Sequence, residues 1–406
     1  MPRYALRRTG EEMFEKAGVI VLVFALLTGC GSGSEDETFE KFSEEYTRIN
    51  EIYNEHVKSV TSREEYAVLQ KQRTGDLGEL LKKYDDALSS DEAELLKSKL
   101  LIEMSKLAEA EEKIDRLIKI DSRVKNEAGL AKARVLIYRK EPGEALAVLK
   151  EVEGKVKPGL ELFSIYLYFV LYSPDVDVME EYARKFLNSR EIPGELTTYK
   201  ADIYRNLSLS ALRKNDHVEA KKMMEKGIAE AEDPAKKSML EGDLAQLGLV
   251  GNPAPPIAAE TWINSAPLSL DRLKGKVVII DFWATWCAPC RRVIPGLVKW
   301  HEKYKNRGLV IIGLTKLYGN YNDDTGSKGT VTQKEEISLV NEFITRHNIT
   351  YPTAVAVEGV NAEKYKIRVI PTLVVIDKKG NVDYINVGAG QEEFLENKIK
   401  KLLEVD

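Results

Sequence analysis

The chain has 406 residues, of which 43% are hydrophobic and 31% charged, and its formal net charge at pH 7 is -5. This length exceeds one ordinary core and allows two or three domains, and the composition is that of folded soluble proteins. The absence of excess positive charge disfavours nucleic acid as a partner. The three cysteines, Cys30, Cys287 and Cys290, cannot form a disulfide framework because their number is odd.

The first thirty residues have the pattern of a secretory targeting segment. Residues 17–27 are apolar apart from one glycine, which suits a signal-peptide core and falls short of the ~20 residues that span a bilayer. The following Leu27-Thr28-Gly29-Cys30 resembles the lipobox of bacterial lipoproteins. The resemblance implies that residues 1–29 are a lipoprotein signal peptide and that Cys30 becomes a lipid-modified N-terminus.

Lipid attachment at Cys30 would hold the protein on a membrane through two acyl chains, at ~0.8 kcal/mol per buried methylene. The expected location is extracytoplasmic, in the periplasm or on the outer face of the cytoplasmic membrane. Residues 30–38 would be the acylated N-terminus and a flexible tether. Two alternatives stay open: a free cysteine buried in an N-terminal helix, and translation from Met13 rather than Met1, because acidic residues precede the apolar core.

Residues 39–249 carry apolar side chains at helical spacing and almost no strand signals, which predicts an all-α domain of short antiparallel helices. Four segments that open amphipathic helices begin at Leu107, Pro142, Glu181 and His217, and their alanines recur at intervals of 35, 38 and 37 residues. The last unit resembles a tetratricopeptide repeat through Tyr204, Leu207, Ser208, Ala211, Ala220 and Met224. The resemblance implies a concave surface that binds a client or partner polypeptide, and a helical spacer without a ligand is the alternative.

The composition changes at residues 251–256, and strands then alternate with helices. Residues 277–283 predict a buried central strand, and a helix follows the sequence Cys287-Ala288-Pro289-Cys290. Because a helix N-terminus stabilises a thiolate, Cys287 is the expected attacking nucleophile. Cys290 lies one helical turn further on the same face and is the expected resolving cysteine.

A metal or haem site is disfavoured around these cysteines. Zinc requires four ligands, and the histidines on this side of the chain, His301 and His347, are far along the sequence. Haem attachment requires a histidine where Arg291 stands. The sequence therefore predicts no metal and no cofactor other than a redox-active Cys287-Cys290 disulfide.

Residues 252–406 resemble the thioredoxin superfamily, and specifically the TlpA-like extracytoplasmic thiol-disulfide oxidoreductases. The motifs that carry the resemblance are Ala254-Pro255, Leu268-Ser269-Leu270, Leu273-Lys274-Gly275-Lys276, Phe282 to Cys290, Ile370-Pro371-Thr372 and Val387-Gly388-Ala389. The resemblance implies an α/β thioredoxin fold. It also implies that Pro371 is cis and presents the backbone of Ile370 to an extended substrate, in a shallow groove lined by Trp286 and Gly388.

Asp281 interrupts the apolar central strand six positions before Cys287. In thioredoxins an aspartate at this position takes the proton from the second cysteine, and desolvation in an apolar strand would raise its pKa as that role requires. A strand-edge aspartate in water is the alternative. Residues 318–329 depart from the simple thioredoxin pattern as a long polar segment, which either borders the groove or is a mobile excursion.

These patterns together predict a membrane-anchored enzyme that exchanges disulfides with protein substrates through Cys287 and Cys290, with reduction favoured over oxidation. The family resemblance suggests secreted thiol proteins such as apocytochrome c as clients, and a membrane electron donor upstream. One alternative is a scaffold protein whose thioredoxin-like domain acts as a redox switch. A peroxidase of the peroxiredoxin type is a third and less favoured hypothesis.

Overall fold

The computed structural model describes residues 33–57, 59–356 and 359–404. The predicted signal peptide, the acylation site Cys30 and both candidate start residues lie outside these ranges. By its spatial contacts the chain divides into two compact units, one ending at Leu207 and the other beginning at Ser208. Over the part of the chain that the structure describes, no helix combines the length and the apolar character needed to cross a membrane.

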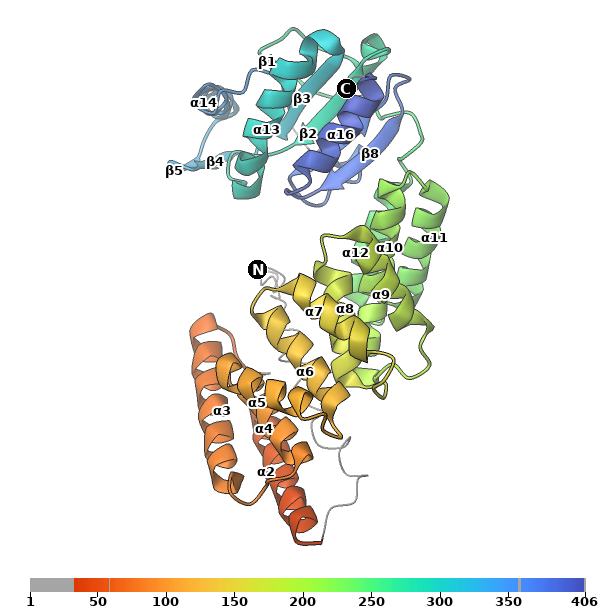
Figure 1. The fold of residues 1–406 in the computed structure, drawn as a ribbon. Helices are drawn as coiled ribbons and strands as arrows, with labels where there is room; N and C mark the ends of the chain where they lie inside the picture. Colours follow the sequence, from red (N-terminus) through yellow and green to blue (C-terminus); the bar gives the residue numbers. More distant parts are fainter. Residues whose placement is uncertain (1–32, 58, 357–358, 405–406) are drawn as a thin grey trace. The chain divides into compact units, whose positions relative to one another are not determined.

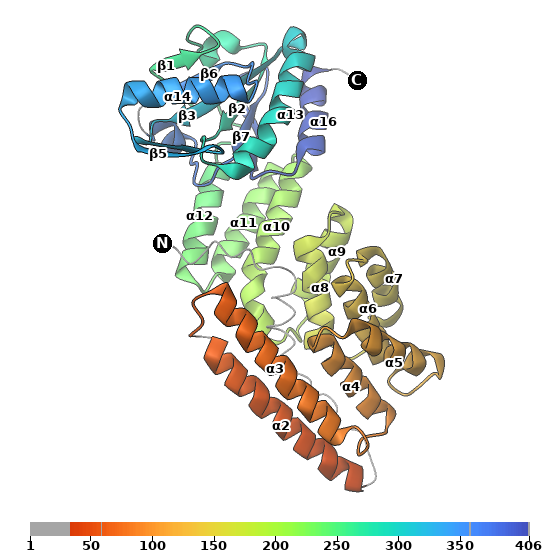
Figure 2. The same ribbon diagram turned by 90° about the vertical axis from the view of Figure 1, so that its left-hand side faces the viewer.

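The described residues of the first unit are helical, which confirms the predicted all-α region, and most consecutive helices pack against each other (Figures 1 and 2). They form α2 (Gly33–Val57), α3 (Arg63–Tyr84), α4 (Asp91–Glu103), α5 (Leu107–Lys119), α6 (Lys125–Tyr138), α7 (Pro142–Val152), α8 (Leu160–Tyr172), α9 (Val176–Asn188), the 3-10 helix η1 (Gly194–Tyr199) and the start of α10 (Lys200–Arg213). Apolar side chains from neighbouring helices fill the space between them, as between α4, α5 and α6.

Short polar residues set where these helices begin. The Ser62 side chain accepts a hydrogen bond from the backbone N–H of Glu65, whose carboxylate accepts the N–H of Ser62 in return. Asp175 likewise accepts the N–H of Val178 at the start of α9. Such caps satisfy amide groups that have no partner within the helix, so the local sequence fixes these boundaries.

The prediction of a flexible tether is wrong for residues 33–38, because α2 already begins at Gly33. Acidic residues in this stretch favour a helix N-terminus, where the backbone dipoles are positive. Glu37 also forms an ion pair with Lys41, one turn further along. The Gly/Ser/acid composition that predicted a tether therefore also suits a helix start.

The internal period predicted three of the four helix starts. Helices α5, α7 and α11 (His217–Glu230) begin at Leu107, Pro142 and His217. The fourth position, Glu181, lies inside α9, because the Asp175 cap starts that helix earlier. The tetratricopeptide resemblance stays a prediction.

The second unit contains the end of α10 and a six-stranded mixed sheet, which confirms the predicted α/β domain. Its elements are α11, α12 (Pro234–Leu247), β1 (Thr261–Ile263), η2 (Leu270–Leu273), β2 (Val277–Phe282), α13 (Ala288–Tyr304), η3 (Lys305–Arg307), β3 (Leu309–Lys316), β4 (Asn320–Asp323), β5 (Gly326–Thr330), α14 (Gln333–Arg346), β6 (Thr353–Ala356), α15 (Val360–Lys364), β7 (Thr372–Ile376), β8 (Val382–Val387) and α16 (Glu392–Leu403).

The strands of the large sheet follow the order β1-β6-β3-β2-β7-β8. Strand β2 runs parallel to β3 and antiparallel to β7, and all six of its residues are buried. Helices α13 and α16 lie side by side along the sheet, whereas α14 lies apart from them (Figures 1 and 2). This arrangement places the carboxyl end of β2, and the cysteine motif after it, next to the start of α13.

The division between the units falls inside α10, whereas the change of composition placed a domain boundary at 249–252. Helix α12 contacts the sheet domain, because the Arg368 guanidinium donates hydrogen bonds to the carbonyl oxygens of Ser238 and Met239 at 2.8 and 3.0 Å. Val250, three positions after the end of α12, pairs with Val382 at the start of β8. The composition change therefore marks where strands begin and not where the compact unit begins.

The long polar segment after β3 is ordered as a hairpin, because β4 and β5 pair antiparallel. Asp323 stabilises its turn by accepting hydrogen bonds from the backbone N–H and the hydroxyl of Thr325, both at 2.7 Å. All residues of β5 are exposed. This polar segment thus forms a two-stranded extension of the domain.

Candidate active site

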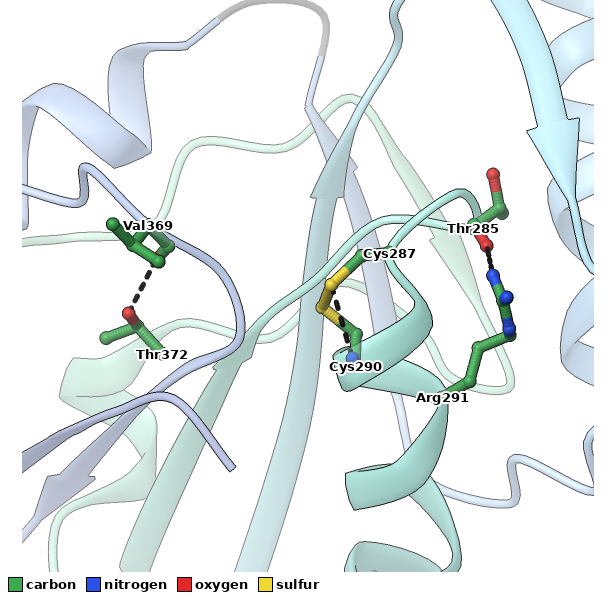
Figure 3. Close-up of a disulfide and its surroundings, with 6 residues drawn as sticks. All are labelled: Thr285, Cys287, Cys290, Arg291, Val369 and Thr372. Atoms are coloured by element: carbon green, nitrogen blue, oxygen red, sulfur yellow. Dashed lines mark hydrogen bonds between the residues drawn. A yellow bond between two sulfur atoms is a disulfide. The ribbon is translucent and has the colours of Figure 1, made fainter. Parts of the chain in front are cut away.

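The two cysteines of the motif are joined in a disulfide at the start of α13 (Figure 3). Cys287 is the N-cap residue of this helix, and the backbone N–H of Cys290 points at its sulfur from 3.2 Å. When the disulfide opens, this N–H group and the positive end of the helix dipole stabilise a thiolate on Cys287. The structure therefore brings together the two residues predicted to exchange electrons and gives the nucleophile its expected place.

Exposed side chains surround the buried disulfide. The side chain of Trp286 is 44% exposed, and Ala288 and Pro289, between the cysteines, are exposed as well. Both cysteines are buried in the bonded state. The exposed apolar side chains of the motif therefore lie where a substrate would contact the protein next to the disulfide.

The second component of the site is the loop before β7, where the Ile370-Pro371 peptide bond is cis, as the resemblance implied. The N–H of Gly388 donates a hydrogen bond to the carbonyl oxygen of Pro371 at 2.8 Å, so this predicted groove residue lies against the cis-proline. The Thr372 hydroxyl donates to the carbonyl oxygen of Val369 at 2.7 Å, and Figure 3 shows this turn beside the disulfide.

Two exposed valines that the sequence analysis did not assign to the groove lie next to its predicted residues. Val369 is 58% exposed and Val387 is 43% exposed, although both are large apolar side chains. They directly precede Ile370 and Gly388, so their position next to the predicted groove residues was the available signal. Exposed apolar side chains gathered around a reactive site are typical of a binding surface.

Asp281 lies in the middle of β2, in register with Gly313 of β3 and Leu373 of β7. Its residue is 2% exposed, which excludes the alternative of a solvated strand-edge aspartate. Burial removes the hydration of the charged carboxylate and raises the pKa of Asp281 to about 7. The predicted environment of Asp281 is confirmed, whereas its role in proton transfer stays a prediction.

The β4–β5 hairpin is attached to the active-site segment. The Thr285 hydroxyl donates a hydrogen bond to the carbonyl oxygen of Asn322 in β4 at 2.7 Å. The ring of Trp286 meets the ring of Tyr318 edge-on, with centroids 5.7 Å apart. Of the two alternatives left open by the sequence, the structure favours the one in which this segment borders the site.

A buried carboxylate holds the start of the hairpin in place. Glu336 of α14 accepts the backbone N–H groups of Tyr318 and Gly319 at 2.8 and 2.9 Å. Arg291 holds the active-site segment that the hairpin contacts. Its guanidinium donates a hydrogen bond to the carbonyl oxygen of Thr285 at 2.8 Å (Figure 3). The sequence analysis did not foresee the contact of Glu336 with Tyr318 and Gly319, since it joins α14 to a segment that lies 17 or 18 residues earlier in the chain.

Comparison with known proteins tests the resemblance on which the site was predicted. Residues 250–385 match the sequence profile of the AhpC/TSA family. The thiol-disulfide oxidoreductase ResA of Bacillus anthracis is 30% identical over 153 residues, which make up 38% of this chain and 78% of ResA. The chain belongs to the thioredoxin-like thiol-disulfide oxidoreductases.

Two further relatives show how far the similarity extends. The thioredoxin-like protein YneN of Bacillus subtilis (strain 168) is 30% identical over 149 residues, which cover 37% of this chain and 78% of YneN. Protein DipZ of Mycobacterium tuberculosis (strain CDC 1551 / Oshkosh) is 31% identical over 188 residues, which cover 44% of this chain. The matched segment spans about a quarter of DipZ, 24% of its length. The thioredoxin-like domain, with its bonded cysteine pair, is thus the part of the chain that defines the family.

Proposed function

We propose that this protein reduces disulfides of other proteins outside the cytoplasm by exchange at Cys287 and Cys290. The observation that carries the proposal is the bonded cysteine pair at the start of α13, beside the cis-proline loop. Membership of the thiol-disulfide oxidoreductases supports this reaction type. The uncharged Ala-Pro between the cysteines and the buried Asp281 favour the reducing direction.

The reaction proceeds in two exchange steps from the dithiol form. The Cys287 thiolate attacks one sulfur of the substrate disulfide, and the other substrate sulfur leaves as a thiolate. The Cys290 thiol then gives its proton to Asp281 and attacks the Cys287 sulfur, which releases the second substrate sulfur. Two electrons pass to the substrate and the Cys287–Cys290 disulfide is restored. A dithiol electron donor at the membrane then reduces it again.

An extended segment of the client fits the surface beside the disulfide. The backbone of Ile370 offers main-chain hydrogen bonds next to the cis-proline, as peptide-binding sheet edges do. The exposed side chains of Trp286, Val369 and Val387 would contact apolar side chains of the client. Gly388 adds no side chain of its own, which leaves the client backbone room to approach.

The location and the clients belong to the same proposal. The lipobox resemblance at residues 27–30 supports acylation of Cys30 and attachment to a membrane outside the cytoplasm. In that compartment the clients would be secreted thiol proteins, with apocytochrome c as one candidate. The helical first unit would bind the client or a partner protein.

A trapping experiment tests the proposal. In Cys290→Ala the second exchange step is blocked, so client proteins should remain bound to Cys287 through mixed disulfides that a reductant cleaves. Gel mobility without and with reductant, followed by mass spectrometry of the adducts, measures the outcome. Cys287→Ala is the matched control, because it keeps one cysteine of the motif and loses the nucleophile. Equal adducts in both variants, or none in Cys290→Ala, would contradict the proposal.

A further inference from the structure

Positive charges follow the cysteine motif on the active-site helix α13. Arg291 and Arg292 come directly after Cys290 in this helix, and its first turn carries no acidic side chain. Because the N-terminal end of a helix dipole is positive, cations near this end do not stabilise the helix. The stability of α13 therefore does not account for the two arginines.

Both arginines lie close to the cysteine motif. The Arg291 guanidinium is held beside the active-site segment by its hydrogen bond to the carbonyl oxygen of Thr285 (Figure 3). Arg292 is exposed, and it follows the exposed Ala288 by four residues. Residues four apart lie on the same face of a helix. A client segment that covers the exposed part of the motif would therefore come close to the Arg292 side chain.

A third cation comes from the sheet. Lys316 ends β3, two positions beyond Leu314, which pairs with the last residue of β2. The Lys316 ammonium lies over the ring of Tyr318, 5.0 Å from the ring centroid. The same ring packs edge-on against Trp286. These contacts connect Lys316 to Trp286, which directly precedes Cys287.

The acidic side chains near these three cations are buried or have other partners. Asp323 and Asp324 of the hairpin form ion pairs with Arg346 of α14. Asp281 and Glu336 are buried, and Glu336 accepts the backbone N–H groups at the start of the hairpin. Among the residues that the structure describes, no carboxylate forms an ion pair with any of the three cations. Their charges are therefore available to a ligand.

The other side of the disulfide is not cationic. Figure 3 shows the Arg291 side chain and the Val369–Thr372 turn on opposite sides of the disulfide. Strand β7 begins at Thr372 and pairs with β8, and the helix after β8 starts with the exposed Glu392 and Glu393. The whole chain also has a negative net charge of -5. The three cations are thus a local feature of one side of the active site.

We propose that the side of the active site formed by Arg291, Arg292 and Lys316 selects client segments with acidic side chains next to the reactive cysteine. The inference rests on the proposed exchange reaction and names the class of client for it. An apolar client residue would pack on Trp286, and a neighbouring carboxylate would then reach the cations. Complementary charges of this kind raise the rate of association and give specificity, and salt weakens their effect.

Peptides with a single cysteine test the inference. The cysteine is blocked as a neutral hydroxyethyl disulfide and flanked by glutamates, glutamines or lysines. The dithiol form of the full chain is mixed with each peptide, and the second-order rate constant for release of the peptide thiol is measured, with the rate of Cys287→Ala subtracted. The glutamate peptide should react about tenfold faster than the lysine peptide, with the glutamine peptide between them. The difference should shrink between about 50 mM and about 500 mM NaCl.

Single substitutions assign the effect to the cations. Lys316→Gln and Arg292→Gln each remove one charge, and each should lower the rate constant with the glutamate peptide about threefold and leave that with the glutamine peptide unchanged. Lys316→Arg keeps the charge and should react as the unchanged protein does. Lys328→Gln is the matched control, because it removes an equal charge from the exposed strand β5. Arg291 is left in place, because it also holds Thr285.

Equal rate constants for the three peptides would overturn the inference and leave the proposed exchange reaction intact. A fall of the same size with all three peptides in Lys316→Gln and Arg292→Gln would also overturn it, because the charges would then act on the Cys287 thiolate alone. No reaction with any peptide would contradict the proposed function and the inference together. A preference for the glutamate peptide that both variants weaken and Lys328→Gln keeps would confirm the inference.

Discussion

At the scale of single residues, Asp281 links the chemistry of the site to the stability of the fold. A carboxylate that is buried without a positive partner is costly, so the folded state holds the proton of this residue to higher pH than the unfolded chain does. Burial raises the pKa of Asp281 from 3.8 to about 7. Between these two values the folded state binds more protons than the unfolded state. The free energy of unfolding therefore falls as pH rises through this range.

Asp281→Asn should remove this pH dependence, because the amide keeps the shape of the carboxyl and carries no charge. Relative to the unchanged protein, the variant should gain stability as pH rises from about 4 to about 7, by up to roughly 4 kcal/mol from a shift of about three units. Urea unfolding of both oxidised proteins at pH 4.5, 6 and 8 measures the difference. A constant difference across these pH values would show that Asp281 titrates normally.

At the scale of elements, the β4–β5 hairpin and the residues that lead into it pack against one side of the cysteine motif. Its contacts are the Thr285–Asn322 hydrogen bond and the edge-on packing of Trp286 on Tyr318. The Glu336 carboxylate holds the backbone from which Tyr318 projects. The position of Trp286 at the rim therefore depends on an element that lies more than 30 residues further along the chain.

Tyr318→Ala should weaken the recognition of protein clients and spare the chemistry of the disulfide. Loss of the aromatic contact removes about 1 kcal/mol of packing on Trp286, which corresponds to about a fivefold higher KM for a client protein. The rate with a small disulfide such as oxidised glutathione should stay the same. Lys328→Ala, on the exposed strand β5 of the same hairpin, is the matched control. An equal loss with both substrates would assign Tyr318 to the exchange step itself.

At the scale of the whole molecule, the last helices of the α-helical region belong to the compact unit that carries the active site. Arg368, three positions before Pro371, is fixed by two carbonyl oxygens at Ser238 and Met239 of α12. Gln246 of the same helix donates to the carbonyl oxygen of Lys366 at 3.4 Å. The segment that leads to the cis-proline is thus held by a helix outside the sheet.

Truncation should reveal this dependence. A fragment of residues 200–406 keeps α10 to α12 and should reduce a small disulfide as the full chain does. A fragment of residues 250–406 loses these contacts, and its melting temperature should be lower by several degrees, since 1 kcal/mol corresponds to about 2–4 °C in a domain of this size. Calorimetry and the reduction assay measure both effects. Equal melting temperatures would place α12 outside the functional unit.

The same fragments distinguish an enzyme from a scaffold. If the helical first unit binds clients, residues 200–406 should keep the activity with a small disulfide and lose activity with the natural client. If the thioredoxin-like domain is only a redox switch for a scaffold, its reduction should instead change the binding of a partner to residues 33–199. Pull-down of partners by the full chain in the oxidised and reduced states measures this second outcome.

The sequence by itself determined the features that depend on neighbours along the chain. Cys287 and Cys290, one helical turn apart at a strand-to-helix junction, identified the redox pair, because a helix start requires only local residues. Asp281 among apolar neighbours predicted its own burial for the same reason. The internal period likewise placed the starts of α5, α7 and α11.

The tertiary structure decided which distant segments meet, because each such contact depends on packing that local patterns do not encode. The sequence could not place Tyr318 on Trp286, Arg368 on α12, or Tyr351 and Thr353 against Gly313. It also misjudged residues 33–38 and left the structure of residues 318–329 open, because polar composition suits a loop, a helix start and an exposed strand alike. The sequence thus determined the chemistry of the disulfide, and the fold decided what surrounds it.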